Sequence, residues 1–165
     1  MELTLKNEHC AVIVTDAGAM LRSLVRDGRE YLWQGDPAYW AGQAPVCFPI
    51  VGVLPKGAST AFGKPCRMKR HGVARINPFT LTEHHRNGAT FTQVADDNTL
   101  AAYPFDYRLE IRYELVDGDL VVTIPVDRLA MPAGYTITTI GVLPYFASEG
   151  KEAVGELVLP DGSGS

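Results

Sequence analysis

Alternation of apolar and polar residues is the dominant pattern along this chain. In the segment 107–115, YRLEIRYEL, every second residue is apolar and the residues between them are charged. A period of two is typical of a strand that has one buried face and one solvated face. Asp117-Gly118 and the apolar segment 120–124 follow, an order that predicts an antiparallel hairpin. We interpret the charged face of the first strand as a solvated surface.

The same pattern predicts two more hairpins and an all-β chain. Strands are predicted over 20–26 and 30–33, joined by Asp27-Gly28, and over 79–85 and 89–94, joined by Asn87-Gly88. Further strands are expected at 3–5, 11–15, 135–140 and 154–159. No stretch of a dozen residues has helical periodicity, and eleven prolines and sixteen glycines interrupt the chain at intervals typical of strands. The fold class predicted is an antiparallel β-sandwich.

Two long segments, 35–56 and 96–106, do not fit a strand pattern and are expected to be loops. The first contains Tyr39 and Trp40 and the apolar run 46–51. Loops of this length in a compact domain are more often functional than idle. We therefore expect these loops to contribute to a site.

Length and composition indicate one domain. A chain of 165 residues with 46% hydrophobic residues is long enough to bury its own core. We assign residues 1–159 to a single β-sandwich domain. The Gly- and Ser-rich end, 160–165, resembles a flexible linker and is left out of the domain.

Charge and cysteine content limit the classes of partner and the cellular compartment that we expect. The net charge is −4, and the fifteen Lys and Arg residues are interpreted as scattered, so we expect no nucleic acid partner. No segment approaches the length of a membrane span and no apolar leader is evident, so we expect neither a membrane nor an export signal. The three cysteines form no CxxC motif, and we interpret them as reduced thiols of a cytoplasmic protein.

Three motifs resemble those of a known family. They are the segment 31–40 with 44–52 (YLWQGDPAYW and APVCFPIVG), the segment 71–75 (HGVAR), and the segment 98–100 with 103–107 (NTL and YPFDY). In this order they are similar to motifs of bacterial aldose 1-epimerase-related proteins. The resemblance is good over 2–126 and poorer afterwards, and family members extend further. It implies a galactose mutarotase-like β-sandwich, here shortened, whose concave sheet holds a monosaccharide.

The resemblance also implies a reaction that needs no cofactor. In that family a carboxylate base removes the proton of the anomeric hydroxyl while a histidine acid protonates the ring oxygen. The ring opens, the aldehyde rotates, and closure produces the other anomer. This is general acid–base catalysis with two groups on opposite sides of one small substrate.

Four residues are candidates for this site. His71 matches the first site histidine of the family and is the candidate catalytic residue; the alternative is a loop histidine without a role. Arg75 is a candidate for binding sugar oxygens, or else it pairs with a carboxylate. Trp33 and Trp40 are candidates for stacking on a sugar ring, or else they belong to the core.

Other positions depart from the family pattern. Val53 stands where the family has an arginine, and Leu143 stands where the acid histidine would fall; neither side chain donates a hydrogen bond. The base of the family would lie beyond this chain, and we interpret Glu149, Glu152 and Glu156 as surface charge. Because catalytic groups act as a unit, we expect an impaired reaction.

No metal site is predicted. His84 and His85 adjoin a turn, and His9 and Cys10 are also neighbours, but adjacent strand residues point to opposite faces. No Gly-x-Ser-x-Gly motif frames a nucleophile. We interpret the two histidines as solvated.

Three hypotheses on function remain open. The first is an active aldose 1-epimerase, and the second is a sugar-binding module without chemistry. The third is a truncated or engineered derivative that serves as a self-assembling scaffold. A shortened sandwich has open sheet edges and apolar surface, so we expect a homo-oligomer.

Overall fold

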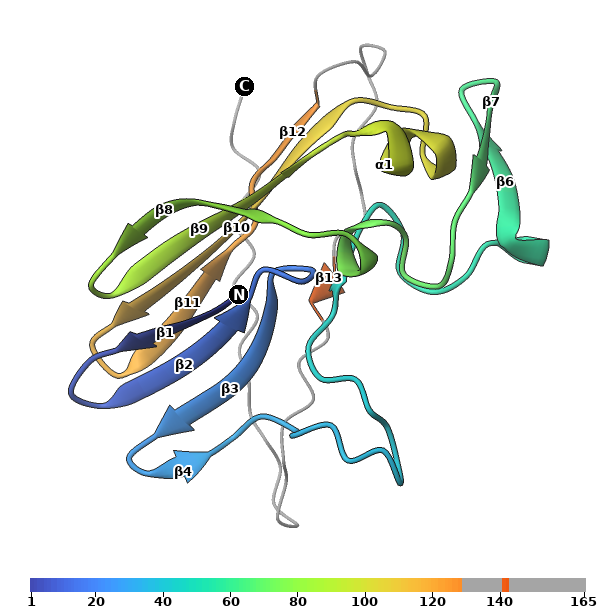
Figure 1. Cartoon of the computed structure of the whole chain (residues 1–165). Coiled ribbons are helices and arrows are strands. Elements are labelled where there is room, and N and C mark those ends of the chain that lie inside the picture. Colours follow the sequence, from blue (N-terminus) through green and yellow to red (C-terminus); the bar gives the residue numbers. More distant parts are fainter. Residues whose placement is uncertain (129–140, 143–165) are drawn as a thin grey trace, which may run out of the picture.

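Two antiparallel sheets dominate the part of the chain that the computed structural model describes, residues 1–128 and 141–142 (Figure 1). The strands of the first sheet follow the order of the chain: β1 (Glu2–Lys6), β2 (Cys10–Thr15), β3 (Met20–Arg26) and β4 (Arg29–Glu30). The strands of the second sheet are β8 (Thr80–His85), β9 (Gly88–Val94), β10 (Tyr107–Val116) and β11 (Asp119–Thr123), with β12 (Val126–Arg128) also paired to β10.

Smaller elements connect the two sheets. β5 (Val46–Cys47) pairs with β13 (Gly141–Val142), and β6 (Ala58–Ala61) pairs with β7 (Lys64–Arg67). The helical elements in the described part of the chain are α1 (Asp97–Ala102) and two 3-10 turns, η1 (Pro55–Gly57) and η2 (Ala74–Ile76). The β6–β7 hairpin stands apart from the two sheets in Figure 1.

The predicted hairpins at 79–94 and 107–124 are confirmed. In the register of β10 with β9, Ile111 lies opposite Phe91, and both side chains are fully buried. Leu115 of β10 lies opposite Leu120 of β11. The alternation seen in the sequence thus has the expected cause: the odd-numbered residues of β10 from Tyr107 to Leu115 are buried, and the even-numbered ones are half-buried (Arg108, Glu110) or exposed.

The strand predicted at 30–33 is wrong beyond its first residue. The Glu30 carboxylate accepts hydrogen bonds from the backbone N–H groups of Leu24 (2.9 Å) and Leu32 (2.8 Å). It also accepts one from the Ser23 hydroxyl. Because this side chain satisfies backbone groups that a longer strand would pair, the chain leaves the sheet after Glu30.

The segment predicted as a loop at 96–106 contains α1. The Asp96 carboxylate accepts from the Thr99 backbone N–H (2.8 Å), and the Asp96 N–H donates to the Thr99 hydroxyl (2.8 Å). This reciprocal pair is a capping box that starts the helix. A helix of 6 residues is less than two turns, too short to show periodicity in the sequence. The other predicted loop, 35–56, contains the short β5 and the start of η1.

One apolar core joins the two sheets, which confirms the predicted sandwich. The core residues that come from these sheets include Leu5, Val12, Val14, Leu21, Phe91, Leu109, Ile111, Tyr113 and Leu115. The Tyr113 hydroxyl crosses between the sheets and donates to the Ala19 carbonyl (2.6 Å). Burial raises the pKa of Tyr113, so this hydroxyl stays a donor at physiological pH.

Several sequence expectations lie outside the described residues: the strands at 135–140 and 154–159, the tail 160–165, Leu143, and the carboxylates Glu149, Glu152 and Glu156. Within the described part, no helix is long and apolar enough to cross a membrane.

Candidate functional site

Two of the sequence motifs are hydrogen-bonded to each other around Gly72. The Phe48 N–H donates to the His71 carbonyl (3.2 Å), and the Val73 N–H donates to the Phe48 carbonyl (2.8 Å). Gly72 lies between them with a φ of +79°, and a Cβ there would stand 2.1 Å from the Phe48 carbonyl oxygen. Only glycine fits so close an approach. The turn that carries His71 is therefore attached to the backbone of a buried core residue.

His71 is held on both its backbone and its ring by Gly52. The His71 N–H donates to the Gly52 carbonyl (2.7 Å), and the Gly52 N–H donates to His71 Nδ1 (3.1 Å). An Nδ1 that accepts leaves the proton of a neutral imidazole on Nε2. The φ of His71 is +68°, in the left-handed region that non-glycine residues seldom occupy, so the turn stores backbone strain at the candidate site.

The electrostatic surroundings keep His71 neutral. Its pKa is lowered first by burial and then by the positive charges of Arg75 and Arg70. At neutral pH the ring is therefore a hydrogen-bond donor through Nε2 rather than a cation. The proton that a general acid would deliver is held less readily than by an ordinary histidine.

The stability of the native protein should fall as the pH drops from 6.5 toward the lower pKa of folded His71. The unfolded histidine takes up its proton first, so the unfolded state binds more protons in this range and stability rises with pH. The stability that His71 contributes is fully present above about pH 6.5, the pKa of a histidine in the unfolded chain. Urea denaturation across this range should show it in the native protein, and a His71→Gly variant should lack it. An NMR titration midpoint of His71 at or above 6.5 would contradict the prediction.

Arg75 lies beside His71 on η2. Its Nε donates to the Arg70 carbonyl (3.0 Å), which attaches the guanidinium to the turn that precedes His71. Its side chain is exposed, and no carboxylate among the described residues lies within ion-pair distance of it. The alternative that Arg75 pairs with a carboxylate therefore has no support in this part of the chain.

Trp33 and Trp40 form a separate group. Trp33 Nε1 donates to the Trp40 carbonyl (2.8 Å), and the ring of Tyr39 meets the Trp33 ring edge-on at 6.2 Å. Tyr39 is 83% exposed and Trp40 is 38% exposed, so neither belongs to the core. The ring of Trp40 lies over Gly42, where a Cβ would stand 2.4 Å from it.

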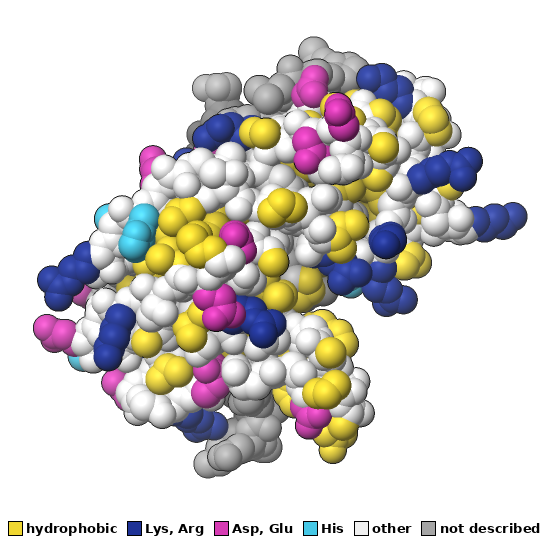
Figure 2. Space-filling view, viewed as in Figure 1, with side chains coloured by type: hydrophobic (Ala, Val, Ile, Leu, Met, Phe, Trp, Pro, Cys, Tyr) yellow, Lys and Arg dark blue, Asp and Glu magenta, His cyan; other side chains and the backbone are white. Residues whose placement is uncertain are grey.

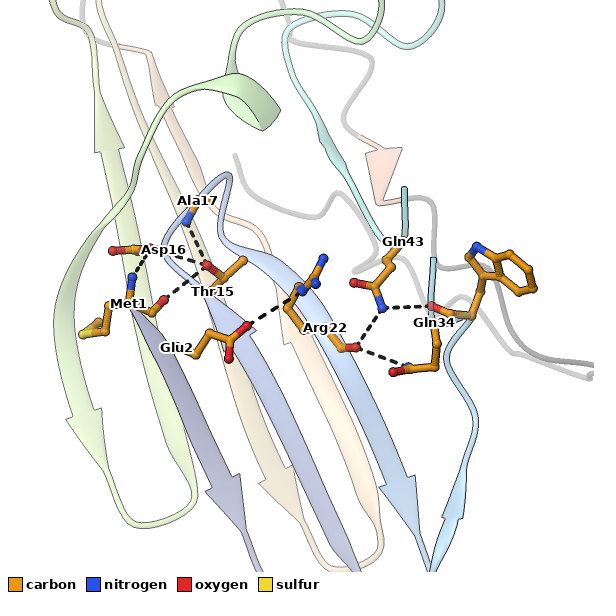
Figure 3. A network of polar contacts seen from close by, with 9 residues as sticks. Met1, Glu2, Thr15, Asp16, Ala17, Arg22, Gln34 and Gln43 are labelled. Atoms are coloured by element: carbon orange, nitrogen blue, oxygen red, sulfur yellow. Dashed lines mark hydrogen bonds and ion pairs between the residues drawn. The ribbon is translucent and has the colours of Figure 1, made fainter. Parts of the chain in front are cut away.

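Gln43 attaches this aromatic group to the first sheet (Figure 3). The side chain of Gln43 is buried, and its Nε2 donates to the carbonyls of Arg22 (2.9 Å) and Trp33 (3.0 Å). The Gln34 side chain donates to the same Arg22 carbonyl (3.3 Å). The four sequence candidates thus fall into two groups: Trp33 and Trp40 beside β3, and His71 and Arg75 beside the Phe48 segment.

Gln93 supports the histidine side of the site and was not found from the sequence. Its Nε2 lies near the carbonyls of Ala74 (3.4 Å), Asn77 (3.3 Å) and Pro78 (3.3 Å), and its Oε1 accepts from the Tyr107 hydroxyl (2.8 Å). These bonds fasten the η2 segment to the second sheet. The partners are far away in sequence, so no local pattern signals them.

The remaining sequence expectations are placed as follows. Val53 is 62% exposed on the chain that follows Gly52, so an apolar side chain stands close to the His71 turn. His84 and His85 are exposed, as predicted. Cys10, Cys47 and Cys66 are free and buried. Residues 1–128 and 141–142 contain no group of three side chains suited to hold a metal ion.

Known structures resemble this fold. A galactose mutarotase-related enzyme from Lactobacillus acidophilus matches with a TM-score of 0.75 and 32% identity over 78% of this chain and 43% of that chain. A galactose mutarotase-like protein from Lactobacillus casei matches with a TM-score of 0.75 and 34% identity over 78% of this chain and 44% of that chain. The fold is therefore galactose mutarotase-like, as the sequence motifs predicted.

Sequence comparison adds the family. The aldose 1-epimerase family model matches residues 1–158. Protein LacX (plasmid) of Lactococcus lactis subsp. lactis is 38% identical over 154 residues, which cover 88% of this chain and 48% of LacX. The chain belongs to the aldose 1-epimerase family. It spans about half the length of the curated relatives it matches.

Proposed function

We propose that this protein binds a monosaccharide at His71 and has little or no epimerase activity of its own. The observation that carries the proposal is the bond from the Gly52 N–H to His71 Nδ1 (3.1 Å), which fixes the ring and its tautomer. Nε2 then presents a donor to a sugar oxygen at little further entropic cost. Arg75, beside this ring, offers further donors for sugar oxygens.

The same bond argues against strong catalysis. To donate a proton from Nε2 as an acid and be neutral afterwards, an imidazole must first carry a proton on both nitrogens. The Gly52 N–H, which donates to Nδ1, opposes protonation of that nitrogen. Val53 offers no donor to a sugar where the family pattern has an arginine, and Leu143 offers no proton. We therefore assign His71 a binding role in preference to an acid role.

The test combines polarimetry with sugar titration. Freshly dissolved α-glucose and α-galactose should mutarotate at the buffer rate in the presence of the protein. Chemical shifts in NMR should show weak, saturable binding of the same sugars. A His71→Gly variant, which removes the ring and suits the positive φ, should bind about fivefold to tenfold more weakly. His84→Ala, at an exposed histidine on β8, is the matched control and should bind as the native protein does.

Each alternative makes a different prediction in this experiment. Acceleration that disappears in His71→Gly would establish the active epimerase and overturn the impairment. The absence of sugar binding together with a stable homo-oligomer in light scattering would favour the self-assembling scaffold. That alternative has one supporting feature, the exposed Val121 and Val122 on the edge strand β11.

A further inference from the structure

The strand β11 has an open edge with exposed apolar side chains. It is the last strand of the second sheet, and among the described residues no strand pairs with it on the side away from β10 (Figure 1). Val121 and Val122 of β11 are exposed, and so is Val116, which lies opposite Asp119 at the start of this strand. An apolar strand edge of this kind is a template for pairing with another chain.

The other edges of the two sheets, as the described residues form them, are protected against such pairing. β4 is only 2 residues long, and β8 has a bulge after Leu81. The exposed side chains of β1 are Glu2, Thr4 and Lys6. Figure 2 shows charged side chains of both signs over the face where Figure 1 places the first sheet. Short length, bulges and charges are ways in which proteins block an edge. By contrast, β11 has no bulge and no proline, and its one charged residue, Asp119, lies at its end.

The backbone of β11 directs hydrogen-bonding groups toward this edge. On β10, the Leu115 N–H donates to the carbonyl of Asn87, the residue before β9 (2.8 Å), so the backbone groups of Leu115 face β9 and not β11. Leu115 lies opposite Leu120. Opposite residues of an antiparallel pair alternate between hydrogen-bonded and non-hydrogen-bonded, so Tyr113 and Val122 also form a non-hydrogen-bonded pair. Leu120 and Val122 therefore direct their N–H and C=O groups away from β10.

We propose that β11 binds β11 of a second copy of this chain, with the two strands antiparallel about a twofold axis at Val121. This register pairs the whole strand, and Leu120 of one copy exchanges backbone hydrogen bonds with Val122 of the other. Asp119 lies opposite Thr123 of the other copy, so no like charges meet, and the charge of Asp119 is already paired with Arg26 (3.2 Å). A twofold interface needs a patch that is complementary to itself, and β11 meets this condition.

Sedimentation equilibrium of the whole chain should show a reversible dimer. Val121→Lys should raise the dissociation constant of this dimer at least about tenfold, because it removes the apolar contact at the axis and places two like charges opposite each other. Within one copy the new lysine lies opposite Glu114, so the hairpin should tolerate it. Val94→Lys, at an exposed valine of β9, is the matched control and should dimerise as the native protein does. Thermal melting should confirm that both variants fold.

Cysteine cross-linking tests the register. Opposite residues of a non-hydrogen-bonded antiparallel pair have Cα atoms about 4.5 Å apart, which is within the reach of a disulfide. Val121→Cys should therefore cross-link two copies in the presence of oxidised glutathione. Thr123→Cys, which lies opposite Asp119 of the other copy, should not. The cysteines of the native chain are free and buried, so they should contribute little background.

The outcomes separate this proposal from the proposed sugar-binding function, because a dimer formed through β11 is compatible with sugar binding at His71. A chain that stays monomeric at its highest soluble concentration would overturn the dimer and leave the β11 edge to a different partner. A dimer that Val121→Lys leaves intact would overturn the choice of surface. Cross-linking of Thr123→Cys as fast as that of Val121→Cys would overturn the register.

Discussion

Replacement of Gly72 by alanine is expected to lower the free energy of unfolding by at least about 3 kcal/mol, or to prevent folding of the His71 turn. The added Cβ would stand 2.1 Å from the Phe48 carbonyl oxygen and 2.5 Å from its carbonyl carbon. Both are backbone atoms of a fully buried residue, so they have no free direction in which to move. Urea denaturation followed by circular dichroism measures the loss.

Gly28→Ala is the control that isolates this contact. Gly28 has a φ of +78°, almost the same as Gly72, but a Cβ there meets nothing within 4 Å. The control should therefore show only the backbone penalty for alanine in the left-handed region, about 1 kcal/mol. Equal losses in the two variants would contradict the close approach of Gly72 to Phe48.

Gln93→Leu is expected to lower the free energy of unfolding by about 2–4 kcal/mol. Leucine fills a similar volume but makes no hydrogen bond, so the Tyr107 hydroxyl and the carbonyls near Nε2 lose their partner in a buried environment. Gln34→Leu is the control: Gln34 is exposed, and its loss should change stability by less than about 0.5 kcal/mol. Chemical denaturation of the two variants measures the difference.

A double-mutant cycle with Tyr107→Phe tests whether the lost hydrogen bond between Gln93 and Tyr107 causes part of this loss of stability. Burial raises the pKa of Tyr107 to about 12, so its hydroxyl is a donor over the whole physiological range. Once this hydroxyl is removed, Gln93→Leu should lose about 1 kcal/mol less stability than in the native background. Strictly additive effects would mean that the bond between Gln93 and the Tyr107 hydroxyl contributes nothing, and that Gln93 acts through its Nε2 contacts or its packing.

The strands that are best predicted from the sequence are those with one apolar face and one charged face. β10 was predicted because its charged residues remain outside, whereas β9 is buried along most of its length and was found through the Asn87-Gly88 turn beside it. The β6–β7 hairpin was missed, because Ala58 to Ala61 are small residues without a clear apolar face. The helix α1 was missed because its 6 residues make less than two turns, too few for a periodic pattern in the sequence.

Candidate site residues could be chosen from the sequence only where a motif contained them. His71 and Arg75 were chosen through their shared motif, and their role at a site stays a prediction; Gly52 bonds to His71, and Arg75 bonds to the Arg70 carbonyl. Arg70 and Gln93 were not found, since their importance comes from contacts that the fold makes and not from their neighbours in sequence.

The attachment of the His71 turn to Phe48 has an evolutionary consequence. Phe48 packs against Tyr107 (ring centroids 4.8 Å apart) and Tyr103 (5.9 Å), while its backbone makes the hydrogen bonds that hold the His71 turn. A substitution that repacks this part of the interior would therefore also shift the imidazole. Position 48 is therefore constrained both by the volume of the core and by the geometry of the His71 turn, so a change in the interior can alter the candidate site without touching it.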